Sequence, residues 1–273
     1  MRTLVHLSDL HFGRVDPALL APLAALVEHL EPDVVVVSGD LTQRARSHEF
    51  QAARAFLDSL PGPQIVVPGN HDVPLYDVLG RFLTPLRKYR RYVTDELWPE
   101  YVDDRIAVLG VNTARSLTFK DGRVNDEQIA QLRARLELLP EALVKIVVTH
   151  HPFDLPAHFH RDELVGRAPL AMAMFADCGV DLLLAGHLHA SHAGNSAARY
   201  KIGGYAALMV QAGTATSTRG RGESNSFNVL RVAAGHIKVE RYSWQEDGAV
   251  FAKVSSESFE RGGAVWTSMR PLL

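Results

Sequence analysis

The sequence contains a single cysteine, Cys178, among its 273 residues. One thiol cannot form an intramolecular disulfide, so nothing in the sequence requires an oxidising compartment. Long apolar runs are also absent: no stretch approaches the roughly 18 residues of a membrane span, and His6 breaks the first apolar run. A signal peptide needs about 7–15 apolar residues and a cleavage site, and the first residues of the sequence contain neither. We therefore expect a cytoplasmic protein without a transmembrane segment.

The sequence also has little net charge. Its 29 lysines and arginines nearly balance 31 aspartates and glutamates, which gives a formal net charge of −2. This balance argues against a generic nucleic-acid binder, although it leaves a local basic patch open. The apolar fraction of 47% is ordinary for a globular protein, and 273 residues can form a sizeable core. The unusual count is 13 histidines, so their positions matter most.

The order of apolar segments predicts a layered α/β fold. Helical spacing begins after Asp16-Pro17, where Pro22 is expected to delay the helix start, and Ser47 is expected to cap a second helix. Asn125 and Gln128 form the pattern of a capping box before a third helix. A fourth helix is expected around 169–178. Continuous apolar runs predict buried strands at 3–8, 33–37, 65–67, 106–111, 145–149 and 181–185.

The last third of the chain has a different pattern. Residues 199–243 contain alternating runs separated by glycine-rich turns, and Ala233-Ala234-Gly235 predicts a hairpin. We expect these strands to form a second, more antiparallel sheet that packs on the first half. No linker divides the chain, so a single domain is expected over 1–273. Residues 73–104 break the α/β rhythm and predict a lid or cap insertion beside the strand ends.

Five of the predicted strands end in a polar cluster. Ligands in open α/β sheets bind beyond the carboxyl ends of the strands, so these clusters are expected to meet at one site. Their positions make a chance distribution difficult to accept. The clusters are Asp9-Leu10-His11, Gly39-Asp40, Gly69-Asn70-His71-Asp72, Thr149-His150-His151 and Gly186-His187-Leu188-His189.

These donors predict a metal site. Nitrogen and oxygen donors without a thiolate suit zinc, manganese or iron, and argue against copper(I) or an iron–sulfur cluster. Seven good donors are too many for one tetrahedral ion. With one shared carboxylate they fit two ions roughly 3.5–4 Å apart.

The motifs D-x-H, G-D, G-N-H-D, V-x-x-H and G-H-x-H, in this order over residues 9–189, resemble those of the calcineurin-like metallophosphoesterases. Segments 213–217 and 226–228 look like the bacterial class III cyclic-nucleotide phosphodiesterases and glycerophosphodiesterases. Gln43 replaces the tyrosine ligand of purple acid phosphatases, and Asp72 replaces the glutamate of serine/threonine phosphatases. The resemblance implies a four-layer α/β/β/α sandwich of two mixed sheets flanked by helices, with the metal site at the strand C-terminal ends.

The resemblance also implies a role for each residue of the motifs. His71 would lie at the phosphate and protonate the leaving alkoxide, and Asp72 would orient it. Asp40 would bridge the two ions. The remaining ligands would be Asp9, His11 and His189 for the first ion, and Asn70, His150 and His187 for the second.

We therefore expect a binuclear metal-dependent phosphodiesterase. Its substrate would be a small diester, either a 3′,5′-cyclic nucleotide or a glycerophosphodiester. Its cofactors would be two divalent ions (manganese, iron or zinc) with a bridging water. Because metal ions can lower the pKa of water from 15.7 to around 7, a bridging hydroxide would attack phosphorus in line. Relatives often dimerise, so a homodimer is an open alternative.

Other functions remain open on the sequence. A UDP-diacylglucosamine-type pyrophosphatase would need an apolar groove near 73–104, and a DNA nuclease of the same superfamily would need to bind DNA. A non-catalytic metal-binding scaffold would be marked by a missing ligand or by replacement of His71. All of these residues are present.

Several residues keep two or more interpretations. His151 is either a neighbour of the site or a substrate contact, and Arg219 and Arg221 could reach a second phosphate. The run 87–92, Arg-Lys-Tyr-Arg-Arg-Tyr, is a solvated helix face, a specificity lid, or a nucleic-acid or membrane patch. Cys178 is expected to be a buried apolar residue. Structural or surface positions are expected for His6, His29, His48, His158, His160, His192 and His236.

Overall fold

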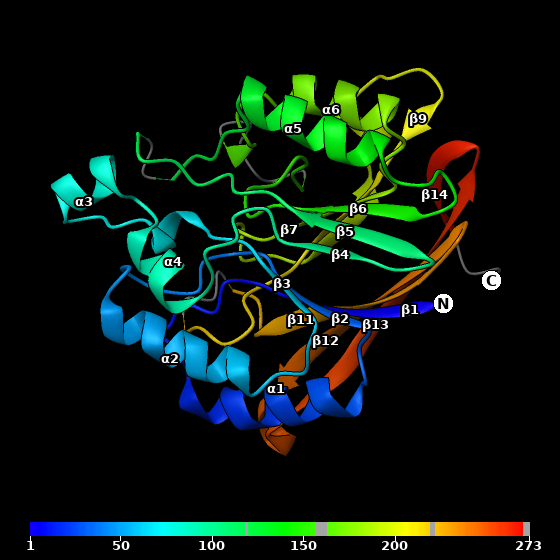
Figure 1. Ribbon diagram of the computed structural model, residues 1–273. Helices are drawn as coiled ribbons and strands as arrows, with labels where there is room; N and C mark the ends of the chain where they lie inside the picture. Colours follow the sequence, from blue (N-terminus) through cyan, green and yellow to red (C-terminus); the bar gives the residue numbers. More distant parts are fainter. Residues whose placement is uncertain (118–119, 157–162, 219–221, 270–273) are drawn as a thin grey trace.

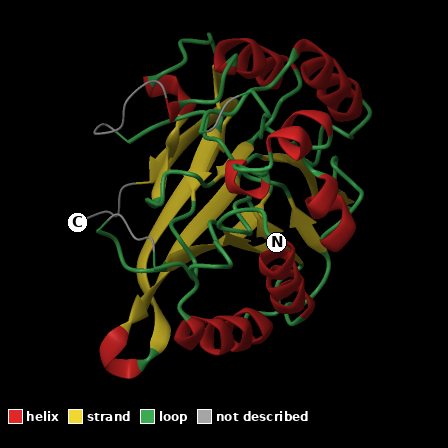
Figure 2. Ribbon diagram, turned by 90° about the vertical axis from the view of Figure 1, so that its left-hand side faces the viewer, coloured by secondary structure: helices red, strands yellow, loops and turns green. Residues whose placement is uncertain are grey.

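The computed structural model describes residues 1–117, 120–156, 163–218 and 222–269. Two mixed β-sheets lie face to face, with helices on their outer faces (Figures 1 and 2), which confirms the predicted four-layer sandwich. The strands of the first sheet are, in spatial order, β3 (Gln64–Val66), β2 (Val34–Val37), β1 (Arg2–Leu7), β11 (Ser226–Ala233), β12 (His236–Gln245), β13 (Val250–Gly262), β14 (Ala264–Met269) and β9 (Tyr205–Ala206). The strands of the second are β4 (Glu100–Val102), β5 (Ile106–Gly110), β6 (Val144–Val148), β7 (Leu182–Ala185), β10 (Leu208–Gln211) and β8 (His192–Asn195).

The antiparallel strands after residue 225 do not form a separate sheet, so this part of the sequence prediction was wrong. β1 is bonded to the parallel strand β2 on one side and to the antiparallel strand β11 on the other, with Leu4 opposite Leu230. The C-terminal strands therefore extend the first sheet, because β11 pairs with the edge of β1 that β2 leaves open. The hairpin between β11 and β12 is confirmed.

Helices cover the outer face of each sheet. α1 (Pro17–His29) and α2 (Ser47–Asp58) pack on the first sheet, and α5 (Asp126–Glu137) and α6 (Ala168–Asp177) pack on the second (Figure 1). The segment between β3 and β4 contains the short helices α3 (Val78–Leu83) and α4 (Arg87–Tyr92). Single 3₁₀ turns lie at η1 (Asn70–Asp72), η3 (Ser196–Ala198) and η4 (Glu246–Gly248).

Two details of the helix starts differ from the sequence prediction. Pro22 lies inside α1, which begins at Pro17 after the Asp16 side chain accepts a bond from the Ala18 N–H. Proline already has a helical φ, so near the start of a helix it can be tolerated at the loss of one hydrogen bond. In α2 the cap position is Arg46, not Ser47, and the Glu49 carboxylate accepts its N–H.

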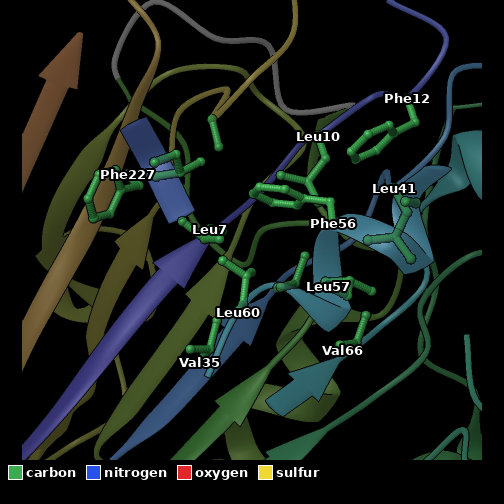
Figure 3. Packing of buried hydrophobic residues seen from close by; sticks show 14 of the residues in the cluster. Leu7, Leu10, Phe12, Val35, Leu41, Phe56, Leu57, Leu60, Val66 and Phe227 are labelled. Carbon is green, nitrogen blue, oxygen red and sulfur yellow. The ribbon is translucent and has the colours of Figure 1, made fainter. Parts of the chain in front are cut away.

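The core has one apolar layer between the sheets and one beneath each pair of helices. Figure 3 shows the layer beneath α2, where Phe56 and Leu57 meet Leu7. Side chains alternate along β1, so Val5 and Leu7 face the helices while Leu4 faces the other sheet. His6 is two residues after Leu4, so it points to the same face of the sheet, and it is fully buried. Cys178 is buried as predicted.

Candidate metal centre

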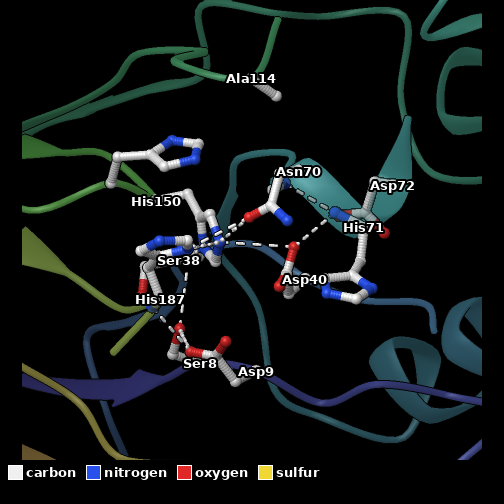
Figure 4. A network of polar contacts seen from close by, with 12 residues as sticks. Ser8, Asp9, Ser38, Asp40, Asn70, His71, Asp72, Ala114, His150 and His187 are labelled. Carbon is white, nitrogen blue, oxygen red and sulfur yellow. Dashed lines mark hydrogen bonds and ion pairs between the residues drawn. The ribbon is translucent and has the colours of Figure 1, made fainter. Parts of the chain in front are cut away.

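The predicted site residues lie at one edge where the two sheets meet. Asp9, Asp40 and Asn70 follow strands β1, β2 and β3 of the first sheet, whereas His150 and His187 follow β6 and β7 of the second. Their loops are joined by direct contacts across this junction (Figure 4). The site is therefore built from both sheets, and neither sheet contains all of its donors.

Gly186 allows the loops of the two sheets to approach each other. A Cβ atom at this position would lie 1.8 Å from the Ser8 hydroxyl oxygen and 2.7 Å from an oxygen of Asp9. These are shorter than any real contact, so a larger residue would push the loop that contains His187 and His189 away from Asp9. Close approach of the backbone is a common reason for glycine at functional sites.

Five of the predicted ligands have a left-handed backbone conformation. The φ angles of Asp9, His11, Asp40, His187 and His189 lie between 50° and 73°, and these five are among nine such non-glycine residues in the described parts of the chain. This conformation costs an L-residue about 1–2 kcal/mol. It reverses the chain just after each strand and turns the side chain toward the junction. Strain of this kind concentrates at functional sites, where surrounding contacts hold it.

The first group of donors consists of Asp9, His11 and His189. Oδ1 of Asp9 lies 3.5 Å from Nε2 of His11 and 3.5 Å from Nε2 of His189. The other oxygen of Asp9 accepts hydrogen bonds from the Ser8 hydroxyl, at 2.6 Å, and from the backbone N–H of His187, at 3.0 Å. Asp9 is thus fixed through one oxygen and presents the other to the two histidines.

The second group consists of Asn70, His150 and His187. Oδ1 of Asn70 lies 3.2 Å from Nε2 of His150 and 3.1 Å from Nδ1 of His187, and the two ring nitrogens are 3.3 Å apart. Nδ1 of His150 donates to the Ser38 carbonyl at 2.7 Å, so its Nε2 faces the group. An outer hydrogen bond of this kind is typical of metal-binding histidines, because it fixes the tautomer.

Asp40 lies between the two groups. Its Oδ2 is 3.6 Å from Nε2 of His11. Its Oδ1 is 3.3 Å from Nε2 of His150 (Figure 4). The backbone N–H of His71 also donates to Oδ1 at 2.9 Å. The two oxygens of one buried carboxylate therefore address different groups of ligands, as a bridging residue requires.

These residues fit a pair of divalent ions. Four donors about 2.1 Å from an ion at tetrahedral corners are about 3.4 Å apart, close to the spacings of both groups. Oδ1 of Asp9 and Nε2 of His11 are buried without a hydrogen-bond partner, an expensive state that a cation would relieve. Sets of candidate ligand atoms within 4.8 Å of one another include Asp9, His11 and His189, and also Asp9, Asp40 and His150.

Burial and mutual charge shift the pKa values of this cluster strongly. Burial raises the pKa of Asp40, but the neighbouring histidines outweigh it and hold that pKa well below its usual range. Burial lowers the pKa of His150, and the charge of Asp40 outweighs it, so the pKa rises to about 9. Burial and then the charge of His150 lower the pKa of His187 to about 3. These shifts favour an ion pair between Asp40 and His150. Because a histidine must be neutral to bind a cation, metal binding would release a proton from His150.

His71 is half-buried beside the ligands, and its ring meets that of His11 edge-on at 4.9 Å. Its Nδ1 is 2.8 Å from the Gln43 carbonyl, which can only accept, so this nitrogen carries a proton. From the sequence, Asp72 is expected to orient this ring, but the hydrogen bonds of its carboxylate go to other groups. Its carboxylate accepts from the backbone N–H groups of Gly69, Leu41 and Thr42 and from the Thr42 hydroxyl.

Asp72 thus fixes the segment next to Gln43, and its influence on His71 passes through the backbone. Burial and then the charge of Asp40 raise the pKa of Asp72 to about 6. The sequence could not separate direct from indirect orientation, because adjacent residues can form either. Other supporting residues that the motifs do not identify are Ser8, Ser38 and Gln43, described above, and Thr214, whose hydroxyl lies 2.6 Å from Nδ1 of His189. Ser8 and Ser38 adjoin the ligand motifs, and Thr214 lies in the 213–217 segment, so position was the only signal available.

His151 is a neighbour of the ligands. Its Nδ1 is 2.8 Å from the Thr113 hydroxyl and its Nε2 is 3.0 Å from the Lys120 carbonyl, so both ring nitrogens are engaged. The buried ring packs against those of His150 and His187, with centroids 4.9 and 4.7 Å apart. These contacts favour a positioning role over a substrate contact.

The other described histidines belong to neither ligand group. His6 is buried and bonded to the Ser38 hydroxyl at 2.9 Å, while His29 and His48 are exposed. His192 and His236 are partly buried. Arg219, Arg221, His158 and His160 lie outside the described residues. In the part of the chain that the structure describes, no helix combines the length and apolar character needed to span a bilayer.

Comparison with known proteins places the site in a family. The chain is 40% identical over 171 residues to glycerophosphodiester phosphodiesterase GpdQ of Enterobacter lignolyticus, covering 56% of this chain and 58% of the relative. It is 26% identical over 202 residues to 3′,5′-cyclic adenosine monophosphate phosphodiesterase CpdA of Escherichia coli, covering 68% and 69%. The first of these alignments thus spans little more than half of the curated relative.

Solved structures share the fold. A purple acid phosphatase of yellow lupin superposes with a TM-score of 0.71 over 95% of this chain and 54% of its own, at 14% identity. A dimetal phosphatase of Danio rerio gives 0.67 over 94% and 98%, at 13% identity. The family model for calcineurin-like phosphoesterases matches residues 2–191, which include every predicted ligand. The chain therefore belongs to the calcineurin-like phosphoesterase family.

Proposed function

We propose that this protein is a binuclear metal-dependent phosphodiesterase that hydrolyses a small phosphodiester. The observation that carries the proposal is Asp40, whose two carboxylate oxygens address the two groups of donors separately. The likeness to a glycerophosphodiester phosphodiesterase and to a cyclic adenosine monophosphate phosphodiesterase supports a diester substrate. The candidate substrates are accordingly a glycerophosphodiester and a 3′,5′-cyclic nucleotide.

The ions would be held by Asp9, His11 and His189 on one side and by Asn70, His150 and His187 on the other, with Asp40 between them. When bound, two divalent ions neutralise phosphoryl oxygens and lower the pKa of a coordinated water toward neutrality. Ser8, Ser38 and Thr214 hold Asp9, His150 and His189 in place, so the donors need little rearrangement to bind metal.

His71 is the residue that we propose as proton donor to the leaving alkoxide. The Gln43 carbonyl already holds a proton on Nδ1, so the ring can release one from Nε2 only as the imidazolium. The backbone N–H of His71 donates to Oδ1 of Asp40 at 2.9 Å, which keeps this residue next to the proposed bridging carboxylate. General-acid assistance of this type contributes about 10²–10⁴-fold.

A phosphoester panel with metal analysis tests the function. Bis(p-nitrophenyl) phosphate, cyclic AMP, a glycerophosphodiester, a pyrophosphate diester and single-stranded DNA would be compared on one preparation. We expect the small diesters to be hydrolysed, EDTA to abolish the rate and Mn²⁺ to restore it. A protein that binds two metals and hydrolyses none of these esters would be a non-catalytic scaffold. Preference for the pyrophosphate or for DNA would select the corresponding alternative.

The role of His71 has its own test in His71→Gln. Metal content should be unchanged, and the rate should fall most for cyclic AMP, whose alkoxide needs a proton. The rate with bis(p-nitrophenyl) phosphate should fall less, because p-nitrophenolate leaves without assistance. His48→Gln, on the exposed surface of α2, is the matched control. An equal loss of rate with both substrates would show that His71 is not the proton donor to the leaving group.

A further inference from the structure

Helix α3 presents apolar side chains to solvent. Tyr76, Val78, Leu79, Phe82 and Leu83 are each between 53% and 75% exposed. In Figure 1 the helix projects away from the body of the molecule. Single exposed apolar residues are common, but five within eight positions form a patch of the kind that marks an interaction site.

The orientation of α3 is fixed by contacts on its opposite side. Arg81, only 3% exposed, donates from Nε to the Ser116 carbonyl at 2.7 Å and from Nη1 to the Pro74 carbonyl at 2.9 Å. Asp77 caps the helix by accepting the N–H of Gly80 at 2.8 Å. The charged residue therefore faces the protein and the apolar residues face solvent, the reverse of an ordinary surface helix.

A basic cavity continues from the apolar face of α3. Arg87, Arg90 and Arg91 of α4 line a cavity of about 710 Å³, together with Leu83, which belongs to both features. Asp95 is the only acidic side chain among the described residues that line it. Apart from the buried Arg81, residues 76–97 contain four basic and three acidic residues, although the whole chain is slightly acidic.

The charge of the surface formed by α3 and α4 indicates which kind of partner binds it. A symmetric contact between two copies would bring together two surfaces with the same basic excess, and their repulsion would oppose it. A neutral apolar partner would remove the arginines from water without compensation. An anionic lipid surface meets both requirements, because acyl chains accept the apolar side chains and phosphates pair with the arginines.

We propose that α3 and the arginine-lined cavity of α4 dock the protein on an anionic lipid surface. Leu79, Phe82 and Leu83 enter the headgroup boundary, and Arg87, Arg90 and Arg91 contact lipid phosphates. The attraction between basic residues and such a surface is electrostatic and is screened by salt. Binding is therefore reversible and depends on both lipid charge and ionic strength.

Vesicle sedimentation of the full chain tests this proposal without reference to catalysis. The wild type should pellet with vesicles of phosphatidylglycerol and phosphatidylcholine, should stay in solution with phosphatidylcholine alone, and should be released by salt. Leu79→Ser with Leu83→Ser, and separately Arg87→Gln with Arg90→Gln and Arg91→Gln, should each lower partitioning at least tenfold. The matched control is Leu138→Ser with Leu170→Ser, two exposed leucines elsewhere.

Three results would overturn the proposal. The first is equal binding to charged and neutral vesicles or to neither, and the second is an equal loss in the control pair. The third is a dimer in light scattering that the Leu79→Ser, Leu83→Ser variant dissociates, with no vesicle binding, since this would assign the apolar face to a second copy. Thermal melting shows that each variant is folded. Hydrolysis of a small diester should be unchanged in all variants, so loss of docking and failure of the proposed activity are distinguished.

Discussion

The metal-centre edge and helix α3 both depart from the usual distribution of side chains, in opposite directions. At the edge, His11, Asp40 and His150 are no more than 1% exposed, whereas Leu79 and Leu83 of α3 are about three-quarters exposed. Buried polar groups are costly unless they are paired, and exposed apolar groups are costly unless they are covered. Each region therefore fits the partner that we propose for it, which is a pair of divalent ions at the edge and an anionic lipid surface at α3.

The two regions differ in how their side chains are supported. Ser8, Ser38 and Thr214 each hold a residue of the metal centre by a hydrogen bond of 2.7 Å or less. On α3, Arg81 and Asp77 hold the backbone but leave the apolar side chains uncovered by described residues. Substitutions at the edge should therefore affect metal binding and catalysis, and substitutions on α3 should affect neither.

The largest effect is expected for Asp40→Asn. Loss of the negative charge between the two donor groups should release at least one metal and lower kcat/KM by roughly 10²–10³-fold or more. Elemental analysis and diester hydrolysis would be measured together. Asp247→Asn, exposed in η4, is the matched control and should stay within twofold. Full activity with two bound metals in Asp40→Asn would show that Asp40 does not bridge the two ions.

A smaller effect is expected for His151→Phe. The substitution keeps a ring against His150 and His187 but removes the bonds to Thr113 and Lys120. Groups that orient metal ligands typically contribute 10–100-fold to metal affinity. Activity should therefore need more metal and recover at saturation, as a metal titration would show. His29→Phe on α1 should leave the titration unchanged, and an unaltered metal affinity in His151→Phe would make this residue merely structural.

The next effect is a pH dependence of stability from His6. Burial lowers the pKa of His6 to about 3, whereas an unfolded histidine has a pKa near 6.5. The unfolded chain thus binds the proton first, and stability is lost as the pH falls below about 6.5. Between pH 6.5 and pH 5 the loss amounts to roughly 2 kcal/mol.

Urea unfolding of wild type and His6→Gln over this range isolates the His6 contribution. Glutamine can keep the bond to Ser38 but does not titrate. The wild type should therefore lose stability relative to His6→Gln as the pH falls. His48→Gln, the same substitution on the exposed surface of α2, is the matched control. Parallel pH profiles for wild type and His6→Gln would show that His6 is not held neutral.

The smallest effect is expected for Leu79→Ser on α3. The side chain is exposed, so the free energy of unfolding should change by no more than about 0.5 kcal/mol. Metal content and diester hydrolysis should equal those of wild type. Leu57→Ser in the core beneath α2 is the contrasting variant and should lower stability by several kcal/mol. A large loss of stability in Leu79→Ser would mean that α3 is packed rather than exposed.

The sequence by itself determined the order of elements and the candidate donors that lie together in the structure. Buried strands read as continuous apolar runs, and Asp9, Asp40 and Asn70 follow such runs directly, so the rule for strand ends was enough to group them. The capping box at Asn125 depends on neighbouring residues only and was also predictable. The lid or cap function expected for residues 73–104 stays a prediction, and unchanged diester hydrolysis in Leu79→Ser would argue against it for α3.

Only the tertiary structure decided how distant segments meet. The C-terminal strands join β1 because of an open strand edge, and no local pattern shows which edge is open. The division of the donors between two sheets, the indirect action of Asp72 and the outward apolar face of α3 likewise depend on contacts between distant segments or with solvent. Local propensity and periodicity act over a few residues, whereas these features are set by packing across the whole chain.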